Sequence, residues 1–139
     1  MVITIDRMKL SKNLMHRIID SDNAALTVKQ ALDGASLKMY AGPQPKSPEV
    51  VPTTDPVIDF GTIRLKHKDG RVMNTESWSG TAVSNEPLGW FRLQGPEAAL
   101  DGSIAVHGRK QADLIIMNES ALGAITVVDH FILDCRIFD

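Results

Sequence analysis

Residues 62–72, which read TIRLKHKDGRV, carry the pattern that decides the fold of this chain. Ile63 and Leu65 alternate with charged residues, as in a strand that buries one face and exposes the other. The dipeptide Asp69-Gly70 comes next, and it favours the two-residue turn of a β-hairpin because both residues tolerate positive φ. The apolar alternation resumes after the turn. The segment therefore predicts an antiparallel hairpin.

Downstream of this hairpin, turn signals recur every eight to twelve residues, which is the spacing of a β-sandwich or barrel. Ser79-Gly80 and Asp101-Gly102 are read as two of these turns. Further strands are expected at residues 81–84, 90–93, 103–107 and 114–117. The fold class predicted is mainly β, an antiparallel β-sandwich of about seven or eight strands.

The last segment, residues 124–138, is predicted to be the central core strand, with a bend near Asp129-His130. Its apolar residues share one parity and are expected to face the core together. They are Ile125, Val127, Phe131, Leu133, Cys135 and Ile137.

Upstream of the hairpin, the sequence predicts one or two short helices. Ser11 is a favourable N-cap, and the apolar residues that follow it have helical spacing. A second helix is expected over 24–32, ending at Gly34. The predicted organisation is an N-terminal arm with short helices over 1–35 and a β-sandwich domain over 36–139, with a proline-rich loop at 42–56. Helices this short need a surface to pack on.

Five prolines fall within fourteen residues of that loop, a density that excludes helix and removes strand hydrogen-bond donors. The segment is either a surface crossover or an arm that lies on a neighbouring subunit. The alternating start, with Val2, Ile3 and Ile5, either adds as a strand to a neighbour's sheet or pairs within its own domain.

The composition of the chain argues against several classes of protein. The chain has 139 residues, a formal net charge of −2 and a single cysteine, which cannot form an internal disulfide. A protein with this charge has no overall field that attracts nucleic acid or an anionic membrane. No stretch resembles a targeting signal or a membrane span, so a cytosol-like compartment and no membrane partner are expected.

No motif indicates catalysis. The four histidines lack metal-ligand spacing, and no phosphate-binding loop, dinucleotide fingerprint or nucleophile elbow is present. Asp129 and His130 are neighbours on a strand, so they are expected to point to opposite faces and not to touch. We therefore predict a non-enzyme with no cofactor and no metal. Nucleic-acid contact is not expected either, because the basic clusters at 64–71 and 109–110 are typical of solvated hairpin faces.

The large aromatic residues are Trp78, Trp90 and Phe91. Strand alternation places Trp90 and Phe91 on opposite faces, so one is expected in the core. The other is expected either under the helices or in a protein–protein interface.

Several segments, taken in order, resemble a group of small tailed-bacteriophage virion proteins. In that group a short helix precedes a strand of the type Gly-x-Leu-Lys-Ile-Tyr-x-Gly-x-x-Pro. Four further motifs follow in order: an aromatic strand of the Trp-Phe-Arg type, an Asp-Gly-Ser hairpin, a strand that starts with Gly-x-x-x-Ala-Asp-Leu, and a terminal strand of the Val-x-x-Phe-x-Leu type. This chain matches at residues 34–45, with one residue more after the first Gly, and at 89–93, 100–104, 108–114 and 123–133. It departs at the proline-dense segment, at Arg109-Lys110 and in its longer ending.

The resemblance implies a structural component of a virus particle, assembled in the host cytoplasm. A capsid decoration or cement protein on the major capsid protein is the first choice, as a homo-oligomer or in many copies. The alternatives are a collar, head–tail or tail-fibre component, or a carbohydrate-binding adhesion module with tryptophan platforms. The interface candidates are Val2, Ile3, Ile5, Pro43, Pro45, Pro48, Pro52, Trp78 and Trp90.

Overall fold

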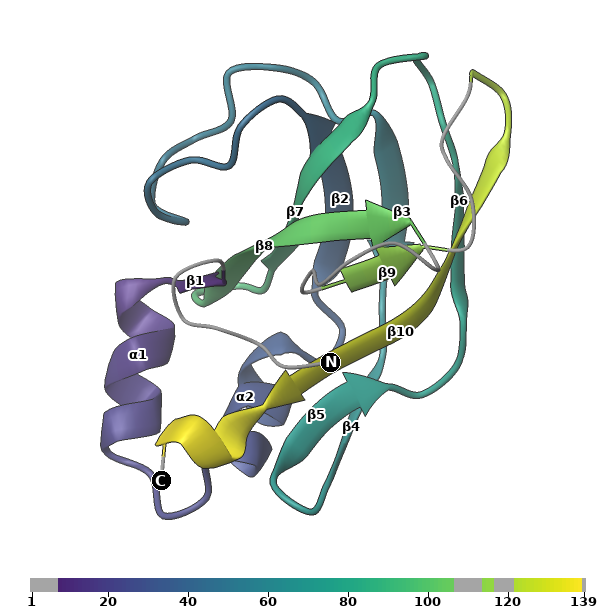
Figure 1. The fold of residues 1–139 in the computed structure, drawn as a ribbon. Coiled ribbons are helices and arrows are strands. Elements are labelled where there is room, and N and C mark those ends of the chain that lie inside the picture. The colour runs from purple at the N-terminus through teal and green to yellow at the C-terminus, as the bar shows by residue number, and fades with distance from the viewer. Residues whose placement is uncertain (1–7, 107–113, 117–121, 139) are drawn as a thin grey trace.

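A computed structural model describes residues 8–106, 114–116 and 122–138. It confirms a mainly β protein with two short N-terminal helices (Figure 1). The helices are α1 (Lys12–Ile19) and α2 (Ala24–Leu32), with a short 3-10 helix η1 (Cys135–Phe138). The strands are β1 (Lys9–Leu10), β2 (Ser36–Ala41), β3 (Ile58–Thr62), β4 (Leu65–Lys68), β5 (Arg71–Asn74), β6 (Trp78–Thr81), β7 (Leu88–Gln94), β8 (Ala99–Val106), β9 (Leu114–Ile116) and β10 (Ile125–Asp134).

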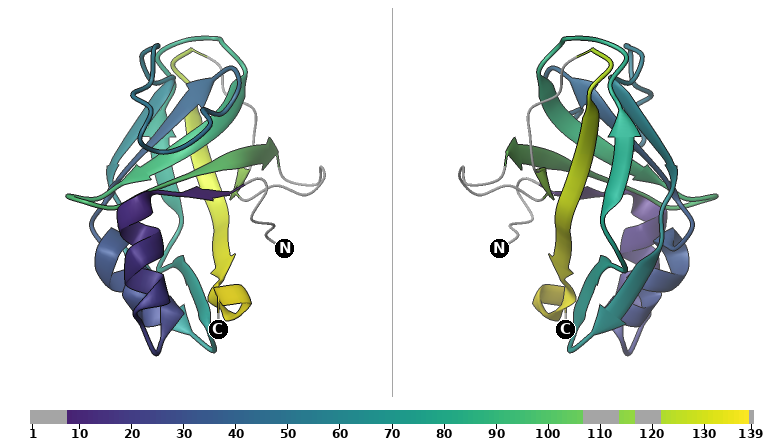
Figure 2. Two further views of the ribbon diagram at one scale, coloured as in Figure 1. Left: turned by 90° about the vertical axis from the view of Figure 1, so that its left-hand side faces the viewer. Right: turned by 90° about the vertical axis from the view of Figure 1, so that its right-hand side faces the viewer.

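The strands form two facing layers that remain hydrogen-bonded to each other. One layer has the order β3-β2-β7-β8, and β1 pairs with β8. In the other layer β10 pairs with β9, with β6 and with β5, and β5 pairs with β4. The parallel pair β8–β9 joins the layers on one side, and an Ile58–Ala82 bridge joins β3 to the end of β6 on the other. The result is a strongly curved, sandwich-like sheet (Figure 2).

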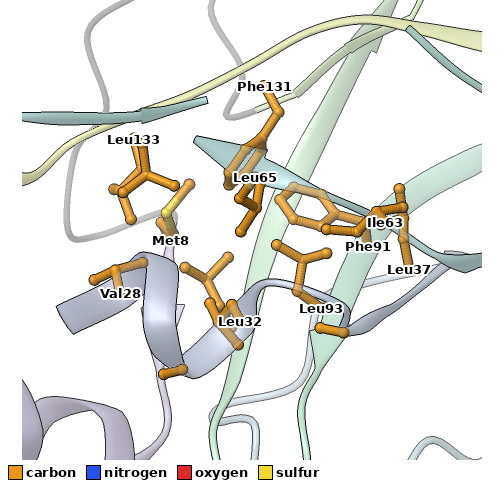
Figure 3. Packing of buried hydrophobic residues seen from close by; sticks show 14 of the residues in the cluster. Met8, Val28, Leu32, Leu37, Ile63, Leu65, Phe91, Leu93, Phe131 and Leu133 are labelled. Atoms are coloured by element: carbon orange, nitrogen blue, oxygen red, sulfur yellow. The ribbon is translucent and has the colours of Figure 1, made fainter. Parts of the chain in front are cut away.

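The hydrophobic core lies between these layers. Phe91 of β7 meets Phe131 of β10 edge to face at 6.1 Å, and Trp78 of β6 packs against the same ring at 6.0 Å. Val28 and Leu32 of α2 close the end of the core nearest the β4–β5 hairpin (Figure 3). Burying large apolar side chains of this kind is the main source of folding free energy.

A side chain caps the start of each helix, and Ser11 is the cap expected for α1. The Ser11 hydroxyl accepts a hydrogen bond from the Leu14 amide, and the Asn23 side chain accepts one from the Leu26 amide. Ser11 is buried, and it also exchanges hydrogen bonds with Ala99 at the start of β8. One residue therefore caps α1 and fixes that helix to the sheet.

The Asp69-Gly70 hairpin is confirmed, with φ of 53° and 78° at its two turn residues. The strand predicted over 62–67 is interrupted between β3 and β4. There Ile63 pairs with the backbone after α2, since the Gly34 amide donates to Ile63 O and the Ile63 amide donates to Ala35 O.

Two dipeptides that were read as turns lie inside strands instead. Asp101-Gly102 is in the middle of β8, where cross-strand pairing with β7 overrides the turn preference. Gly80 lies in β6, and a Cβ there would stand 2.7 Å from Ile58 Cγ2. The glycine permits the close approach of β3.

The terminal strand contains the expected irregularity, a register shift between Val128 and His130. A bulge inserts one residue and so reverses the parity of burial. The prediction that Ile125, Val127 and Ile137 lie in the core with Phe131 was therefore wrong. Ile125 is exposed, Val127 is half-buried, and Ile137 is an exposed residue of η1.

Asn74 supports β10 at this bulge, where β5 has ended and β6 has not begun. Its Nδ2 donates to the Asp129 and Glu76 carbonyls, at 3.2 and 2.9 Å, and its Oδ1 accepts from the Phe131 amide at 3.1 Å. The side chain thereby replaces a missing stretch of neighbouring strand.

We expect Asn74→Ala to lower the free energy of unfolding by about 2 kcal/mol, because it removes the hydrogen bonds of Asn74 to partly buried backbone groups of β10. Urea denaturation measures the change. Asn13→Ala, at an exposed position of α1, is the matched control and should shift stability by less than about 0.5 kcal/mol. Equal losses in both variants would contradict the bridging role.

Candidate interaction surface

The outer face of β2, β7 and β8 carries a row of large polar and aromatic side chains. Tyr40 and Trp90 are directly opposite each other and stack, with ring centroids 4.4 Å apart and an interplanar angle of 15°. The Arg92 guanidinium lies over the Trp90 ring at 5.4 Å from its centroid. Asp101 is the cross-strand neighbour of Arg92.

Arg92 and Asp101 form a bidentate ion pair. Arg92 Nε donates to Asp101 Oδ1 at 2.6 Å and Nη2 donates to Oδ2 at 2.9 Å. The side chains are 7% and 0% exposed. Burial raises the pKa of Asp101, and the hydrogen bond from Arg92 opposes that rise. The hydrogen bond to Asp101 raises the pKa of Arg92. A pair removed from water in this way specifies one geometry, since either charge without its partner is costly.

The cover over this face is the proline-rich loop, residues 42–56, which we term the proline strap. It contains no helix or strand. Pro52 lines a small hollow of about 140 Å³ together with Tyr40 and Arg92. The strap returns to the sheet at Val57, whose amide donates to Met39 O. The expectation that the helices cover the second aromatic was therefore wrong, because the strap borders Trp90.

Glu49 fixes the middle of the strap to the N-terminus of α1. Its Oε1 accepts a hydrogen bond from the Lys12 amide at 2.7 Å. That hydrogen bond lowers the pKa of Glu49 below its usual value. A carboxylate is favoured at this position because the first amides of a helix lack internal partners.

A larger pocket, of about 440 Å³, lies between the strap and the sheet. Its lining combines strap residues with Trp90 and Glu86. At the base of the strap the backbones approach closely, since a Cβ at Gly89 would stand 2.1 Å from Gly42 O. The strap is therefore held at its base, at Glu49 and at Val57.

The predicted interface residues are separated by the structure. Val2, Ile3 and Ile5 lie outside the described residues. Pro43 is exposed, Pro45 and Pro52 are half-buried, and Pro48 is buried. Trp78 and Trp90 are 7% and 3% exposed, so neither ring is presented at the surface as a contact or a stacking platform.

Exposed apolar side chains occur on the strap itself. Val50 and Val51 are 45% and 78% exposed, next to the Glu49 anchor. A second group, formed by Val83, Leu122 and Ile125, is exposed where β6 and β10 meet.

Sequence reasoning missed Arg92, Asp101 and Glu49 as organising residues. Arg92 could have been noticed, because it is a charged residue inside a predicted strand with aromatic residues. Its partner Asp101 was missed because Asp101-Gly102 was interpreted as a turn.

The expectation that Asp129 and His130 cannot touch was also wrong. His130 Nε2 lies 3.3 Å from Asp129 Oδ2, at the position where the register of β10 shifts. The His130 side chain is well exposed. Within the described ranges, no three His, Cys, Asp or Glu side chains are grouped so that they could hold a metal ion.

No helix of the described residues has the length and apolar character needed to cross a membrane. Comparisons with protein-family models, with curated proteins and with solved structures gave no match to this chain.

We expect Arg92→Met to lower the free energy of unfolding by about 3–5 kcal/mol, because it leaves the Asp101 carboxylate buried without its partner. Adding Asp101→Leu should recover most of that loss. Urea denaturation of the single and double variants tests this. Arg17→Met, which removes an exposed pair with Glu97, is the control and should cost less than about 1 kcal/mol. A double variant no more stable than the single would contradict this account of the pair.

We expect Glu49→Ala to loosen the strap and expose Trp90. In a Trp78→Phe background, acrylamide quenching of Trp90 fluorescence should rise roughly two-fold or more, as for a locally opened segment. Glu97→Ala is the matched control.

The same interaction has a pH dependence. Because the folded pKa of Glu49 is lower than the ordinary value of 4.5, its stabilising contribution is present above that pH and is lost as the pH falls through the folded pKa. Quenching should therefore increase on acidification with Glu49 present. Quenching that is insensitive to both the substitution and the pH would show that Glu49 does not hold the strap.

Proposed function

We propose that this protein is a non-enzymatic structural component of a tailed-bacteriophage virion, and that it binds the assembled head as a decoration protein. The ordered resemblance of five sequence segments supports the virion class. The fixed strap with its exposed valines is the observation that carries the decoration role.

The strap suits docking for an energetic reason. Association has to offset the conformational entropy of the groups it orders. Prolines restrict the strap in advance, and Glu49 holds it beside Val50 and Val51, so little order remains to be imposed on binding. Exposed apolar side chains on a strap that is anchored in this way fit a repeated site on an assembled shell. The same surface would suit a collar or tail site, which copy number distinguishes.

Quantitative gel densitometry of purified particles tests the location. A decoration protein should be present in hundreds of copies per particle. Copies in single figures or low tens would move the assignment to the collar or tail. Absence from purified particles would contradict the virion proposal.

Adding the purified protein back to emptied heads tests the contact. Binding that is specific for the assembled state should raise the melting temperature of the heads by mass action. Val50→Ser with Val51→Ser should abolish the rise, whereas Val83→Ser with Ile125→Ser, which removes exposed apolar groups elsewhere, should preserve it. No rise with the unsubstituted protein would exclude the decoration role, and the reverse pattern of variants would exclude the strap as the contact.

A further inference from the structure

The β4–β5 hairpin lies at the end of the molecule opposite the strap (Figure 1), and its strands contain several lysine and arginine residues. Arg64, just before β4, and Lys66 and Lys68 of β4 form a row of cations that we call the basic row. Alternate residues of an extended strand share a face. Leu65, on the other parity, is buried, so the basic row faces away from the core.

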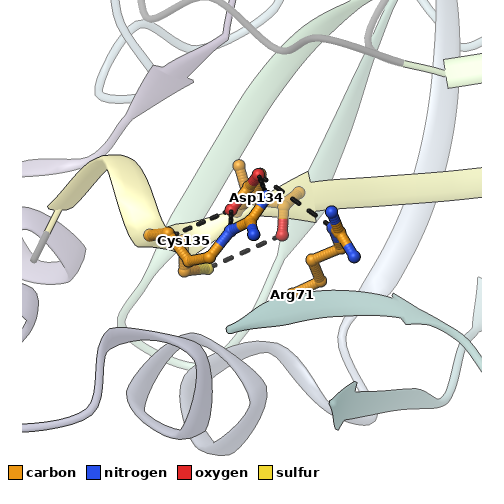
Figure 4. A network of polar contacts seen from close by, with 5 residues as sticks. Arg71, Asp134 and Cys135 are labelled. Carbon is orange, nitrogen blue, oxygen red and sulfur yellow. Dashed lines mark hydrogen bonds and ion pairs between the residues drawn. The ribbon is translucent and has the colours of Figure 1, made fainter. Parts of the chain in front are cut away.

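Two carboxylates, those of Asp134 and Asp33, neutralise part of the positive charge near the basic row. Asp134 lies between Arg71 and the guanidinium of Arg136, and both cations lower the pKa of Asp134, to about 2 (Figure 4). Asp33 lies between Lys29 and Arg64. Lys66 and Lys68 are exposed, and no carboxylate of the described residues pairs with either. The row therefore keeps a surplus of positive charge.

The backbone of β4 presents hydrogen-bonding groups beside these cations. β4 is the last strand in the order of the described sheet. The two-residue turn makes Lys68 and Arg71 a hydrogen-bonded pair, and Lys66 and Met73 the next such pair. The amide and carbonyl of His67 therefore point away from β5, toward the outer edge.

The carboxylate of Asp33 already binds to this edge of β4. Its Oδ1 accepts a hydrogen bond from the Leu65 amide at 2.9 Å, which confirms that the odd-numbered amides point outward. Its Oδ2 lies 3.4 Å from Arg64 Nη2. One carboxylate thus satisfies an edge amide and the first cation of the basic row at the same time. Further along β4, the His67 amide and the side chains of Lys66 and Lys68 repeat this combination of an edge amide and cations. No carboxylate of the described residues pairs with them.

From this geometry we infer that the β4 edge binds an extended acidic segment of another protein, which adds as a further strand. Acidic residues at every second position of the segment would lie opposite Lys66 and Lys68, because cross-strand neighbours repeat with the same period of two. The His67 amide and carbonyl would supply main-chain hydrogen bonds. This binding does not depend on the virion assignment.

The chemistry of the surface favours a peptide over a nucleic acid. Single-stranded nucleic acids are held by cations together with aromatic rings on which bases stack. The hairpin, residues 64–74, contains no phenylalanine, tyrosine or tryptophan. Lysines on an edge strand also discourage pairing between identical strands, which leaves an oppositely charged strand as the matched partner.

Fluorescence polarisation with a labelled eight-residue peptide, Glu alternating with Thr, tests the binding at low salt. A peptide of the same length with Lys in place of Glu is the ligand control. The Glu peptide should bind and the Lys peptide should not. Lys66→Glu should weaken binding about ten-fold, because it turns a favourable cross-strand pair into a repulsive one. Lys46→Glu, an equal charge change on the exposed strap, should leave binding unchanged.

Amide hydrogen exchange separates strand addition from simple charge attraction. The His67 amide should become protected when the Glu peptide binds, whereas the Lys66 amide, already bonded to Met73, should change little. Binding without protection of His67 would overturn strand addition, and equal binding of the Glu and Lys peptides would overturn the acidic partner. A single-stranded oligonucleotide that binds more tightly than the Glu peptide and is lost in Lys66→Glu would replace the proposal with a nucleic-acid surface.

Discussion

The buried pair of Arg92 and Asp101 constrains the rest of this structure. A guanidinium and a carboxylate on the outer face of a sheet would ordinarily be solvated, and here they are almost fully covered. Covering them has a desolvation cost, which the bidentate hydrogen bonds offset while the surrounding groups hold the pair in place. Trp90 and Tyr40 extend the pair as a stacked row, so that the whole face of β2, β7 and β8 needs a fitted cover.

The proline strap provides that cover, and its composition explains how it does so. Proline restricts the backbone of the unfolded as well as the folded chain, so that less entropy is lost when the strap is placed. Glu49 then fixes the strap through a helix amide that would otherwise lack a partner. The segment that looks least structured in the sequence is therefore held at several points. Its exposed valines, Val50 and Val51, belong to the lining of the pocket beside Trp90.

Local signals predicted much of the fold. Ser11 and Asp69-Gly70 act through hydrogen bonds or dihedral angles of a few neighbouring residues, and the structure uses them as a cap and a turn. The features that could not be predicted depend on distant partners. Asp101-Gly102 has the composition of a turn, and Arg92 on another strand holds it in β8. Ile125 has the parity of Phe131, and a bulge supported by Asn74 reverses it. The segment that covers Trp90 could not be predicted either, because it depends on the path of the proline strap back to the sheet.

We propose that this domain acts by fitting its strap against a repeated protein surface. A three-dimensional reconstruction of the purified particle tests this proposal. Density for this fold is expected at repeated sites on the outside of the head, with Val50 and Val51 facing the shell. Density confined to the collar or tail, or a domain bound to the shell with its strap facing solvent, would contradict it.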